Sequence, residues 1–280
     1  MRPILPTPNP TPNPDPPPSP RRVSLALGSG GARGWAHLGA LRALRERGIE
    51  IAAVAGTSMG ALVGAFLAAG RLDALESVAS TLDWRQLARF LGEFTPSRSG
   101  LTEGHRLLKE AAPLLRARTF ADLALPYRAV ATDLETGEET VLSDGPLLPA
   151  VRASISIPGL FTPVHLGGRW LIDGGLVNPV PVNVARALAP GLPVLAIDVT
   201  QGMPAAPDSP SKAPPMTDVL TRTIRIAESR LAAYRRAEDP PDLLVEVPVG
   251  PIGTLDFLRA PEASALGHAA TLSALDAAGW

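Results

Sequence analysis

The stretch VAGTSMGALVGAFLAAG, residues 54–70, contains no charged residue and admits two interpretations. The uncharged run extends back to Ile51, so it is long enough to cross the hydrocarbon core of a membrane. Alternatively, a buried strand ends near Gly56 and turns sharply into a helix, which leaves Ser58 exposed at the corner.

The spacing of Gly56, Gly60 and Gly64 at every fourth position is typical of packed transmembrane helices. The residue types favour the corner, because β-branched residues stand before Ser58 and helix formers follow it. The motif GTSMG (56–60) fits G-x-S-x-G between a predicted strand and a predicted helix. Side chains two positions before or after the serine would collide with the neighbouring strand and helix. We therefore expect the strand–serine–helix corner, with the helix dipole facing the hydroxyl.

Strand–loop–helix units on either side of this corner predict an α/β fold. VSLALG (23–28) is predicted as a buried strand, followed by a glycine-rich loop and a helix from Trp35 to Gly48. IEIAAVAG (49–56) is the next predicted strand, and its helix ends near Gly70. Two such units in succession predict a mostly parallel central sheet with helices on both faces, a three-layer α/β/α sandwich.

The rest of the chain continues this alternation. Residues 201–215 are predicted as a surface loop, and the helix after them is amphipathic. Its predicted apolar face consists of Val219, Leu220, Ile224, Ala227 and Leu231. The other predicted elements are a mostly helical region over 72–120 broken near 94–100, strands over 126–134, 138–143, 167–175, 193–200 and 242–249, and helices over 146–155, 180–190, 216–236 and from residue 261.

Composition limits the classes of function. The chain has 280 residues, 45% of them hydrophobic, and a net charge of −1, which gives no support for a nucleic-acid partner. Cysteine is absent, so disulfides, thiol nucleophiles and cysteine metal sites are excluded. Ten of the first twenty residues are proline, which predicts a disordered tail over 1–20 and one domain over 21–280. The tail has no apolar run of signal-peptide length, so we expect a cytoplasmic protein.

The loop GSGGARG (28–34) is predicted to bind an anion. The dinucleotide pattern G-x-G-x-x-G fails in register, because Arg33 stands at the last position when Gly28 is the first. There is also no GK[ST] sequence after the loop, so it is not a P-loop. What remains is a set of backbone amides at a helix start, which suits the oxyanion of a tetrahedral acyl intermediate.

A serine nucleophile needs a base, and an aspartate is the better candidate. The histidines, which are His37, His105, His165 and His268, lie in no recognisable catalytic motif and form no metal-ligand cluster. Asp173 ends an apolar strand and is followed by Gly174 and Gly175, which let the backbone turn away. A carboxylate at the carboxyl end of a strand lies on the edge where open α/β sheets place their sites.

Three motifs, in this order, resemble those of the patatin-like phospholipases: SGGARG (29–34), GTSMG (56–60) and DGG (173–175). The similarity extends to RASISIPGLFTPV (152–164) and GGLVNPVPV (174–182), and it covers nearly all of residues 21–280. The chain resembles the small bacterial RssA-type members, near the neuropathy-target-esterase branch but without its cyclic-nucleotide domains. One departure is Ser29, where the family loop usually opens with glycine.

The resemblance implies a patatin-type fold and a serine hydrolase of lipid acyl esters with a Ser–Asp dyad. Ser58 is then the nucleophile, and Asp173 is the base that later activates water. The oxyanion hole would comprise the amides of Gly30 and Gly31 with contributions from Met59 and Arg33. The resemblance implies no cofactor or metal, a lipid or fatty-acyl ester substrate, and no nucleic acid. The motif glycines that support these residues are Gly28, Gly34, Gly56, Gly60, Gly174 and Gly175.

Two alternatives remain open from the sequence. One is an ordinary triad of Ser58, an acid and His268, although SALGHAATL around this histidine is predicted as mid-helix. The other is a non-catalytic member of the family that binds lipid or regulates. In either case, the loop 201–215 and the helix after it, which carries several arginines, are candidates for reversible contact with the inner membrane surface.

Overall fold

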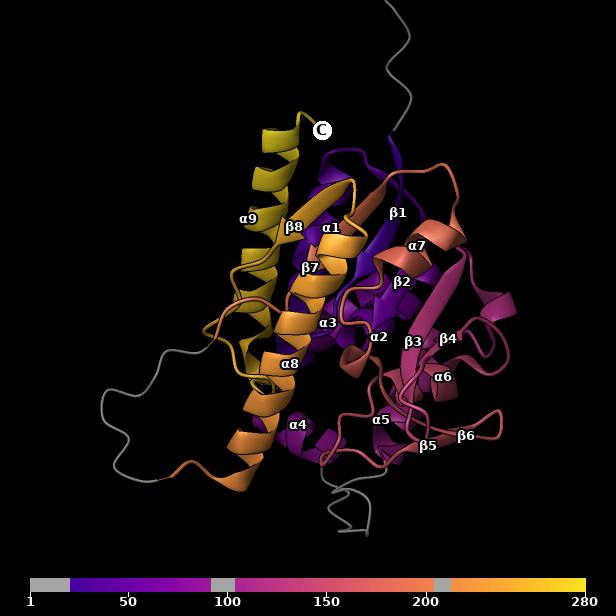
Figure 1. Cartoon of the computed structure of the whole chain (residues 1–280), viewed down its shortest axis with the longest axis vertical. Helices are drawn as coiled ribbons and strands as arrows, with labels where there is room; N and C mark the ends of the chain where they lie inside the picture. Colours follow the sequence, from indigo (N-terminus) through magenta and orange to yellow (C-terminus); the bar gives the residue numbers. More distant parts are fainter. Residues whose placement is uncertain (1–20, 92–103, 204–212) are drawn as a thin grey trace, which may run out of the picture.

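A computed structural model describes residues 21–91, 104–203 and 213–280 of the chain (Figure 1). The proline-rich tail 1–20, the predicted break near 94–100 and most of the loop 201–215 lie outside these residues. The predictions made for those segments therefore stay predictions.

A mixed, mostly parallel sheet runs through the described residues and confirms the predicted fold class. Its strand order is β5-β6-β3-β2-β1-β7-β8, and β4 also pairs with β3. Strands β3, β2, β1, β7 and β8 are parallel, whereas β4 and β6 pair antiparallel with β3, and β5 pairs antiparallel with β6. The strands are β1 (Arg22–Leu27), β2 (Glu50–Thr57), β3 (Tyr127–Asp133), β4 (Glu139–Leu142), β5 (Val164–Leu166), β6 (Arg169–Asp173), β7 (Val194–Asp198) and β8 (Leu243–Glu246).

Helices cover both faces of the sheet, as Figure 1 shows. They are α1 (Ala36–Glu46), α2 (Met59–Ala68), α3 (Leu72–Thr81), α4 (Trp84–Leu91), α5 (His105–Leu115), α6 (Leu147–Ser154), α7 (Val182–Leu188), α8 (Met216–Glu238) and α9 (Ala260–Ala278). The short strand β5 is an element that the sequence analysis did not predict.

Alternation along the strands builds the two cores. Leu25 and Leu27 of β1 pack in the larger core with α1, α2 and α9, whereas Ala26 faces the opposite side. The smaller core lies between the sheet and the pair α7 and α8, and it includes Val182 and Ala232. Because successive side chains of a strand point to opposite faces, one apolar strand supplies both cores. This is the three-layer α/β/α arrangement.

The uncharged stretch forms the strand–serine–helix corner and not a membrane span. β2 ends at Thr57 and α2 occupies only Met59–Ala68, so the run is divided between a central strand and a short helix. Among the residues that the structure describes, no helix is both long enough and apolar enough to cross a membrane.

Helix α8 turns a different face inward than the sequence predicts. Its buried residues are Arg225, Glu228 and Ala232, which recur at helical spacing, whereas Val219 is 44% exposed and Leu220 is 38% exposed. Ala227 is also exposed, whereas Ile224 and Leu231 are half-buried, so the predicted apolar face meets the core only along one edge. The buried charges are tolerated because they are hydrogen-bonded, as the site below shows.

Candidate active site

Ser58 lies at a strained corner between β2 and α2. Its φ is 54° and its ψ is −121°, and among the described residues other than glycine only Arg116 also has a positive φ. A Cβ at residue 56 would collide with the carbonyl of Gly60, and one at residue 60 would collide with the carbonyl of Leu27. Both glycines are therefore required for the reason predicted. The sequence analysis expected an exposed serine, but Ser58 is only 2% exposed. It faces cavities inside the protein and not the outer surface.

A second serine, Ser154, stabilises this corner through a hydrogen bond to its backbone. The amide of Ser58 donates a hydrogen bond to Ser154 Oγ at 2.9 Å, and that hydroxyl donates to the carbonyl of Val130 at 2.5 Å. The Ser58 amide is thus occupied and does not face a substrate. Sequence reasoning did not identify Ser154, although it stands inside the stretch 152–164 that carries the family resemblance.

Asp173 meets Ser58 directly. Ser58 Oγ donates to Asp173 Oδ2 at 2.6 Å, and Asp173 Oδ1 accepts from the amide of Gly175 at 2.8 Å. The carbonyl of Asp173 accepts from Thr132 Oγ1 at 2.7 Å, which fixes the end of β6 against β3. One carboxylate oxygen is therefore held in place while the other faces the serine hydroxyl.

The location of Asp173 was predicted correctly, but for a reason that needs correction. β6 runs antiparallel to β3, so its carboxyl end is not one of the aligned ends of the parallel strands. Asp173 pairs with Ala131, which follows the residue of β3 that pairs with Thr57. β6 therefore approaches from beyond the carboxyl edge of the parallel strands and ends beside Ser58.

The electrostatic setting raises the proton affinity of Asp173. Burial and, to a smaller extent, the nearby carboxylate of Glu228 raise its pKa to about 8, against the hydrogen bonds from Ser58 and Gly175. A carboxylate with a raised pKa binds a proton more tightly, which favours proton transfer from the serine hydroxyl.

The glycine-rich loop 28–34 runs beside Ser58, and several of its backbone amides already donate hydrogen bonds within the protein. The amide of Gly28 donates to Ile197, that of Ser29 to Pro179, and that of Ala32 to Thr254. Among the described residues, no hydrogen bond uses the amides of Gly30 or Gly31. Gly31 lines both cavities that reach Ser58.

His37 supports this loop and was not assigned a role from the sequence. It is completely buried, and its Nε2 lies 2.8 Å from the carbonyl oxygen of Gly28. Because burial lowers the pKa of His37 to about 4, the ring is neutral at physiological pH, and Nε2 carries the proton that it donates to this carbonyl. The signal was its place in the sequence, because it lies in the first turn of the helix that follows the glycine-rich loop.

Arg33 also holds the loop and does not line either cavity at Ser58. Its Nε donates to the carbonyl of Gly30 at 3.1 Å and its Nη1 to that of Thr200 at 3.2 Å. Its Nη2 stands 3.9 Å from Glu228 Oε2. Burial lowers the pKa of Arg33, but a guanidinium stays charged in proteins.

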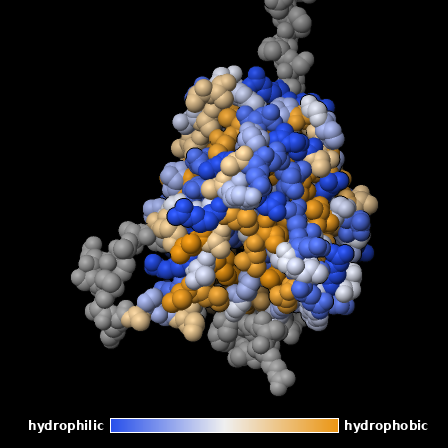
Figure 2. Space-filling model, in the orientation of Figure 1, coloured by the Kyte–Doolittle hydropathy of each residue, from blue (hydrophilic) through white to orange (hydrophobic). Residues whose placement is uncertain are grey.

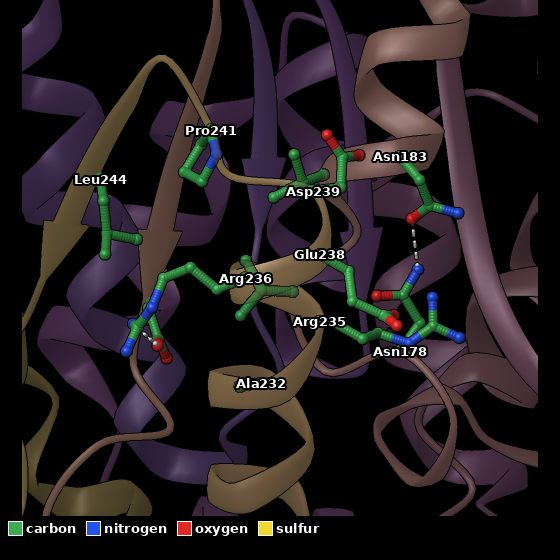
Figure 3. A pocket seen from close by; sticks show the side chains of 12 residues that line it. Asn178, Asn183, Ala232, Arg235, Arg236, Glu238, Asp239, Pro241 and Leu244 are labelled. Atoms are coloured by element: carbon green, nitrogen blue, oxygen red, sulfur yellow. Dashed lines mark hydrogen bonds and ion pairs between the residues drawn. The ribbon is translucent and has the colours of Figure 1, made fainter.

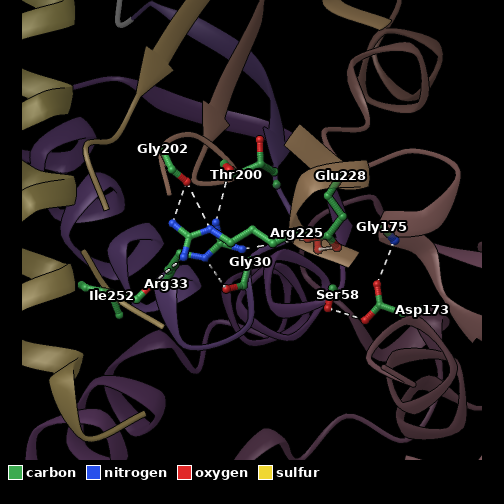
Figure 4. A network of polar contacts seen from close by, with 12 residues as sticks. Gly30, Arg33, Ser58, Asp173, Gly175, Thr200, Gly202, Arg225, Glu228 and Ile252 are labelled. Carbon is green, nitrogen blue, oxygen red and sulfur yellow. Dashed lines mark hydrogen bonds and ion pairs between the residues drawn. The ribbon is translucent and has the colours of Figure 1, made fainter. Parts of the chain in front are cut away.

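Helix α8 brings Glu228 and Arg225 into the same network (Figure 4). Ser29 Oγ donates to Glu228 Oε1 at 2.7 Å. Arg225 Nη2 donates to the carbonyls of Gly202 at 2.7 Å and Gly250 at 2.8 Å. Burial raises the pKa of Glu228, whereas Arg33, Ser29 and Arg225 act in the opposite direction. Neither residue belongs to a motif that the sequence analysis used for the site.

The other described imidazoles lie away from Ser58. His268 Nε2 is 2.8 Å from Glu46 Oε2 between α9 and α1, and the His165 ring contacts that of Trp170 in a tilted arrangement with 4.9 Å between centroids. His105 begins α5, and its side chain is outside the described atoms. The arrangement does not support the Ser–Asp–His alternative with His268.

Two cavities reach Ser58. The larger has a volume of about 130 Å³ and an almost entirely apolar wall. The smaller, about 10 Å³, contacts Ser58, Asp173, Ser29 and Glu228. The apolar cavity is lined by Gly31, Trp35, Ser58, Met59, Leu62, Phe66, Leu75, Val78, Leu82, Leu87, Glu110, Ala111, Leu114, Ile155, Ile157, Phe161 and Phe257.

Another hollow lies beside the carboxyl end of α8 and has no nucleophile (Figure 3). Arg235 and Arg236 line it together with Asn178, which donates a hydrogen bond to Asn183 at 2.8 Å. In the part of the chain that the structure describes, no three His, Asp or Glu side chains are grouped to hold a metal ion.

Comparisons with known proteins identify relatives of this chain. The sequence profile described as "Patatin-like phospholipase" matches residues 25–186. An uncharacterized NTE family protein of Mycobacterium tuberculosis is 35% identical, over 91% of this chain and 92% of the relative. A second NTE family protein of that species is 32% identical, over 92% of this chain and 47% of the relative. The crystal structure of VipD from Legionella pneumophila shares the fold, with a TM-score of 0.50 and 15% identity over 93% of this chain and 67% of VipD.

Proposed function

This chain belongs to the patatin-like phospholipase family, in its neuropathy-target-esterase and RssA-type branch, and from this premise we propose that it is a serine acyl hydrolase that cleaves carboxylic ester bonds of lipids. The observation that carries the proposal is the 2.6 Å hydrogen bond from Ser58 Oγ to Asp173 Oδ2. It joins a strained, buried serine to a carboxylate whose pKa is raised, at the mouth of an apolar cavity. This combination is what an activated nucleophile requires.

In the acylation step, Asp173 accepts the proton of Ser58 while Oγ attacks the ester carbonyl. The tetrahedral intermediate collapses, the bond to the alcohol breaks, and the alcohol leaves with the proton from Asp173. In the second step, Asp173 takes a proton from water, which attacks the acyl-serine. Collapse of the second intermediate releases the fatty acid and returns the proton to Ser58 Oγ.

The amides of Gly30 and Gly31 are proposed to hold the oxyanion, with the amide of Met59 at the start of α2 beside them. Two facts support this assignment. The first two amides have no acceptor among the described residues, and Gly31 and Met59 line the apolar cavity together with Ser58. Arg33 and His37 are proposed to act indirectly, because they hold the carbonyls of Gly30 and Gly28 and so orient the loop. In other hydrolases, removal of one hydrogen-bond donor from the oxyanion hole lowers turnover about 10²–10³-fold.

The apolar cavity is proposed to take the acyl chain. Its wall comes from α2, α3, α5 and the segment after α6, and the side chains are almost all aliphatic or aromatic. A fatty-acyl chain gains about 0.8 kcal/mol per buried methylene in such a cavity. A phospholipid, a lysophospholipid or a simpler fatty-acyl ester presents this group, so the activity class is that of a phospholipase A, lysophospholipase or carboxylesterase.

Contact with a lipid surface is proposed to be reversible. The outer side of α8 exposes Met216 at 80%, Val219 at 44% and Ile226 at 51%. Figure 2 shows apolar side chains gathered on the lower half of the face that carries this helix. Such side chains insert shallowly into a membrane surface without spanning it.

The test uses purified protein with p-nitrophenyl butyrate and with phosphatidylcholine or lysophosphatidylcholine vesicles. We expect release of p-nitrophenol and of fatty acid, and covalent labelling by a fluorophosphonate on the peptide that contains Ser58. Ser58→Ala, with an unchanged circular dichroism spectrum, should abolish labelling and hydrolysis. Absence of labelling in the wild type would support the non-catalytic alternative and refute the proposal.

A further inference from the structure

A second buried carboxylate lies beside the dyad and has no part in the steps described above. Glu228 is 6% exposed and lies outside the stretch 25–186 that the family profile matches. Figure 4 shows it between the Ser58–Asp173 pair and the guanidinium group of Arg225. Burying a carboxylate is costly, so its place next to the nucleophile calls for a physical explanation.

Two anchors fix the Glu228 carboxylate. Ser29 Oγ donates to Oε1 at 2.7 Å, and Arg33 Nη2 stands 3.9 Å from Oε2. Ser29 is the position at which this sequence departs from the usual glycine of the family loop. The hydroxyl that this departure introduces therefore joins the loop next to Ser58 to helix α8.

Polar groups of three segments converge at Gly175. A Cβ at residue 175 would collide with Glu228 Oε1 and would lie 2.8 Å from Ser29 Oγ and 3.1 Å from Asp173 Oδ1. The carboxyl groups of Glu228 and Asp173 thus approach each other across a glycine that has no side chain to separate them.

The small cavity is lined by the same three polar side chains, those of Ser29, Asp173 and Glu228. Its volume of about 10 Å³ is close to the least that holds one water molecule. Most of its wall is apolar, but Ser58, Asp173, Glu228 and Ser29 also line it and offer the two to four polar partners that a buried water needs. A fatty-acyl chain does not fit this volume, whereas the neighbouring apolar cavity suits one.

We propose that Glu228 is a positioning residue that holds the hydrolytic water of the deacylation step in this cavity. The inference rests on the proposed function, because it requires an acyl group on Ser58. Glu228 keeps its own protonation state and forms one hydrogen bond with the water. Asp173 removes a proton from that water as its oxygen bonds to the acyl carbon. The bond from the acyl carbon to Ser58 Oγ then breaks, and the proton passes from Asp173 to Ser58 Oγ.

The experiment separates the two half-reactions. The rate of fluorophosphonate labelling reports the attack by Ser58, which needs no water. Decay of a preformed butyryl-enzyme, followed by intact mass after removal of excess p-nitrophenyl butyrate, reports deacylation. Both are measured at pH 9, where Asp173 is ionised to the greater extent.

The variants are Glu228→Leu, which removes the polar anchor, and Glu228→Gln, which keeps an oxygen and adds a donor. Glu238→Gln is the matched control, because Glu238 is an exposed glutamate at the end of the same helix. We expect Glu228→Leu to slow decay of the butyryl-enzyme about tenfold or more, with labelling changed by less than about threefold. Glu228→Gln should retain part of the lost rate, and Glu238→Gln should match the wild type.

Equal loss of labelling and decay in Glu228→Gln, or no change in either, would overturn the proposal. The first result would mean that Glu228 acts on the proton affinity of Asp173 alone. If Glu228→Leu does not fold, Glu228→Gln and Ser29→Ala decide, since both should accumulate more butyryl-enzyme than the wild type. A wild-type protein that forms no butyryl-enzyme would instead refute the proposed function itself.

Discussion

The two sides of Ser58 differ in the size of the cavity and in the polar side chains that reach it. On one side, the cavity of about 130 Å³ is walled by aliphatic and aromatic side chains from α2, α3 and α5. On the other, the cavity of about 10 Å³ is bordered by Asp173, Glu228 and Ser29. The Ser58 hydroxyl stands where a large apolar cavity meets a small cavity that also reaches the carboxylates of Asp173 and Glu228.

In the proposed acyl hydrolase, this difference separates substrate binding from proton transfer. The free energy of binding an apolar chain depends on the apolar surface area that is buried. Many sets of apolar residues of suitable size can therefore form the cavity, and no sequence motif identifies it. Proton transfer depends on geometry within tenths of an ångström, so it needs specific residues on constrained backbone. Substitutions on the two sides should therefore fail in different ways.

The largest loss is expected on the polar side, at the dyad. Ser58→Ala and Asp173→Asn should each reduce kcat by about 10³-fold or more, and the double variant should be no worse than either, because the two groups act as one unit. Steady-state kinetics with p-nitrophenyl butyrate measure all three. His268→Ala is the control, since its ring pairs with Glu46 between α9 and α1. If His268→Ala were inactive while Asp173→Asn stayed active, the base would be wrongly assigned.

The next effect concerns pH and also arises on the polar side. Asp173 accepts a proton only when it is ionised, so activity is lost as pH falls through its pKa, which burial and Glu228 raise to about 8. We expect kcat/KM to fall about tenfold per pH unit below that value. The groups that act on this carboxylate are Glu228, the Ser58 hydroxyl and the Gly175 amide. Glu228→Gln removes the neighbouring charge, so it should shift this acid limb of the pH–rate profile to lower pH.

A pH–rate profile of kcat/KM between pH 4 and pH 10 checks this expectation. A limb near pH 4 would mean that the carboxylate is solvated during turnover. A limb near pH 6.5 that disappears in a histidine variant would indicate an imidazole base. His37 is an unsuitable candidate for that role, because burial lowers its pKa to about 4.

The smallest effect is expected on the apolar side. Ala111 of α5 lines the larger cavity, and Ala111→Leu fills part of it. Lost room for about two methylenes costs about 1.6 kcal/mol, so kcat/KM for p-nitrophenyl dodecanoate should fall about tenfold. The acetate ester should be hydrolysed at the wild-type rate.

Ala112→Leu is the matched control, because the neighbouring alanine is exposed on the same helix. An equal loss with both esters in Ala111→Leu would show that this cavity does not receive the acyl chain. Equal losses in both alanine variants would indicate a general disturbance of α5.

The sequence alone was sufficient to predict the corner at Ser58 and the position of Asp173 at the end of a strand. A glycine two residues before Ser58 and another two residues after it allow a backbone that side chains at these positions would block. The DGG sequence ends a strand and turns away at once, which freed the carboxylate of Asp173 to face Ser58. Such local constraints involve residues that are close together in the sequence, so a short sequence pattern is enough to predict them.

Tertiary structure alone decided which distant groups complete the site. The sequence gives no sign that α8 would turn Arg225 and Glu228 inward, because a helix with both apolar and charged sides is expected to bury the apolar one. Here two charged residues are buried, while the predicted apolar face is exposed or half-buried: the guanidinium of Arg225 donates to carbonyls of the loops at Gly202 and Gly250, and Ser29 donates to Glu228. The roles of Ser154 and His37, and the antiparallel approach of β6, likewise depend on contacts between segments far apart in the chain. Burial and hydrogen bonding are properties of the folded neighbourhood, and a residue's sequence neighbours do not specify them.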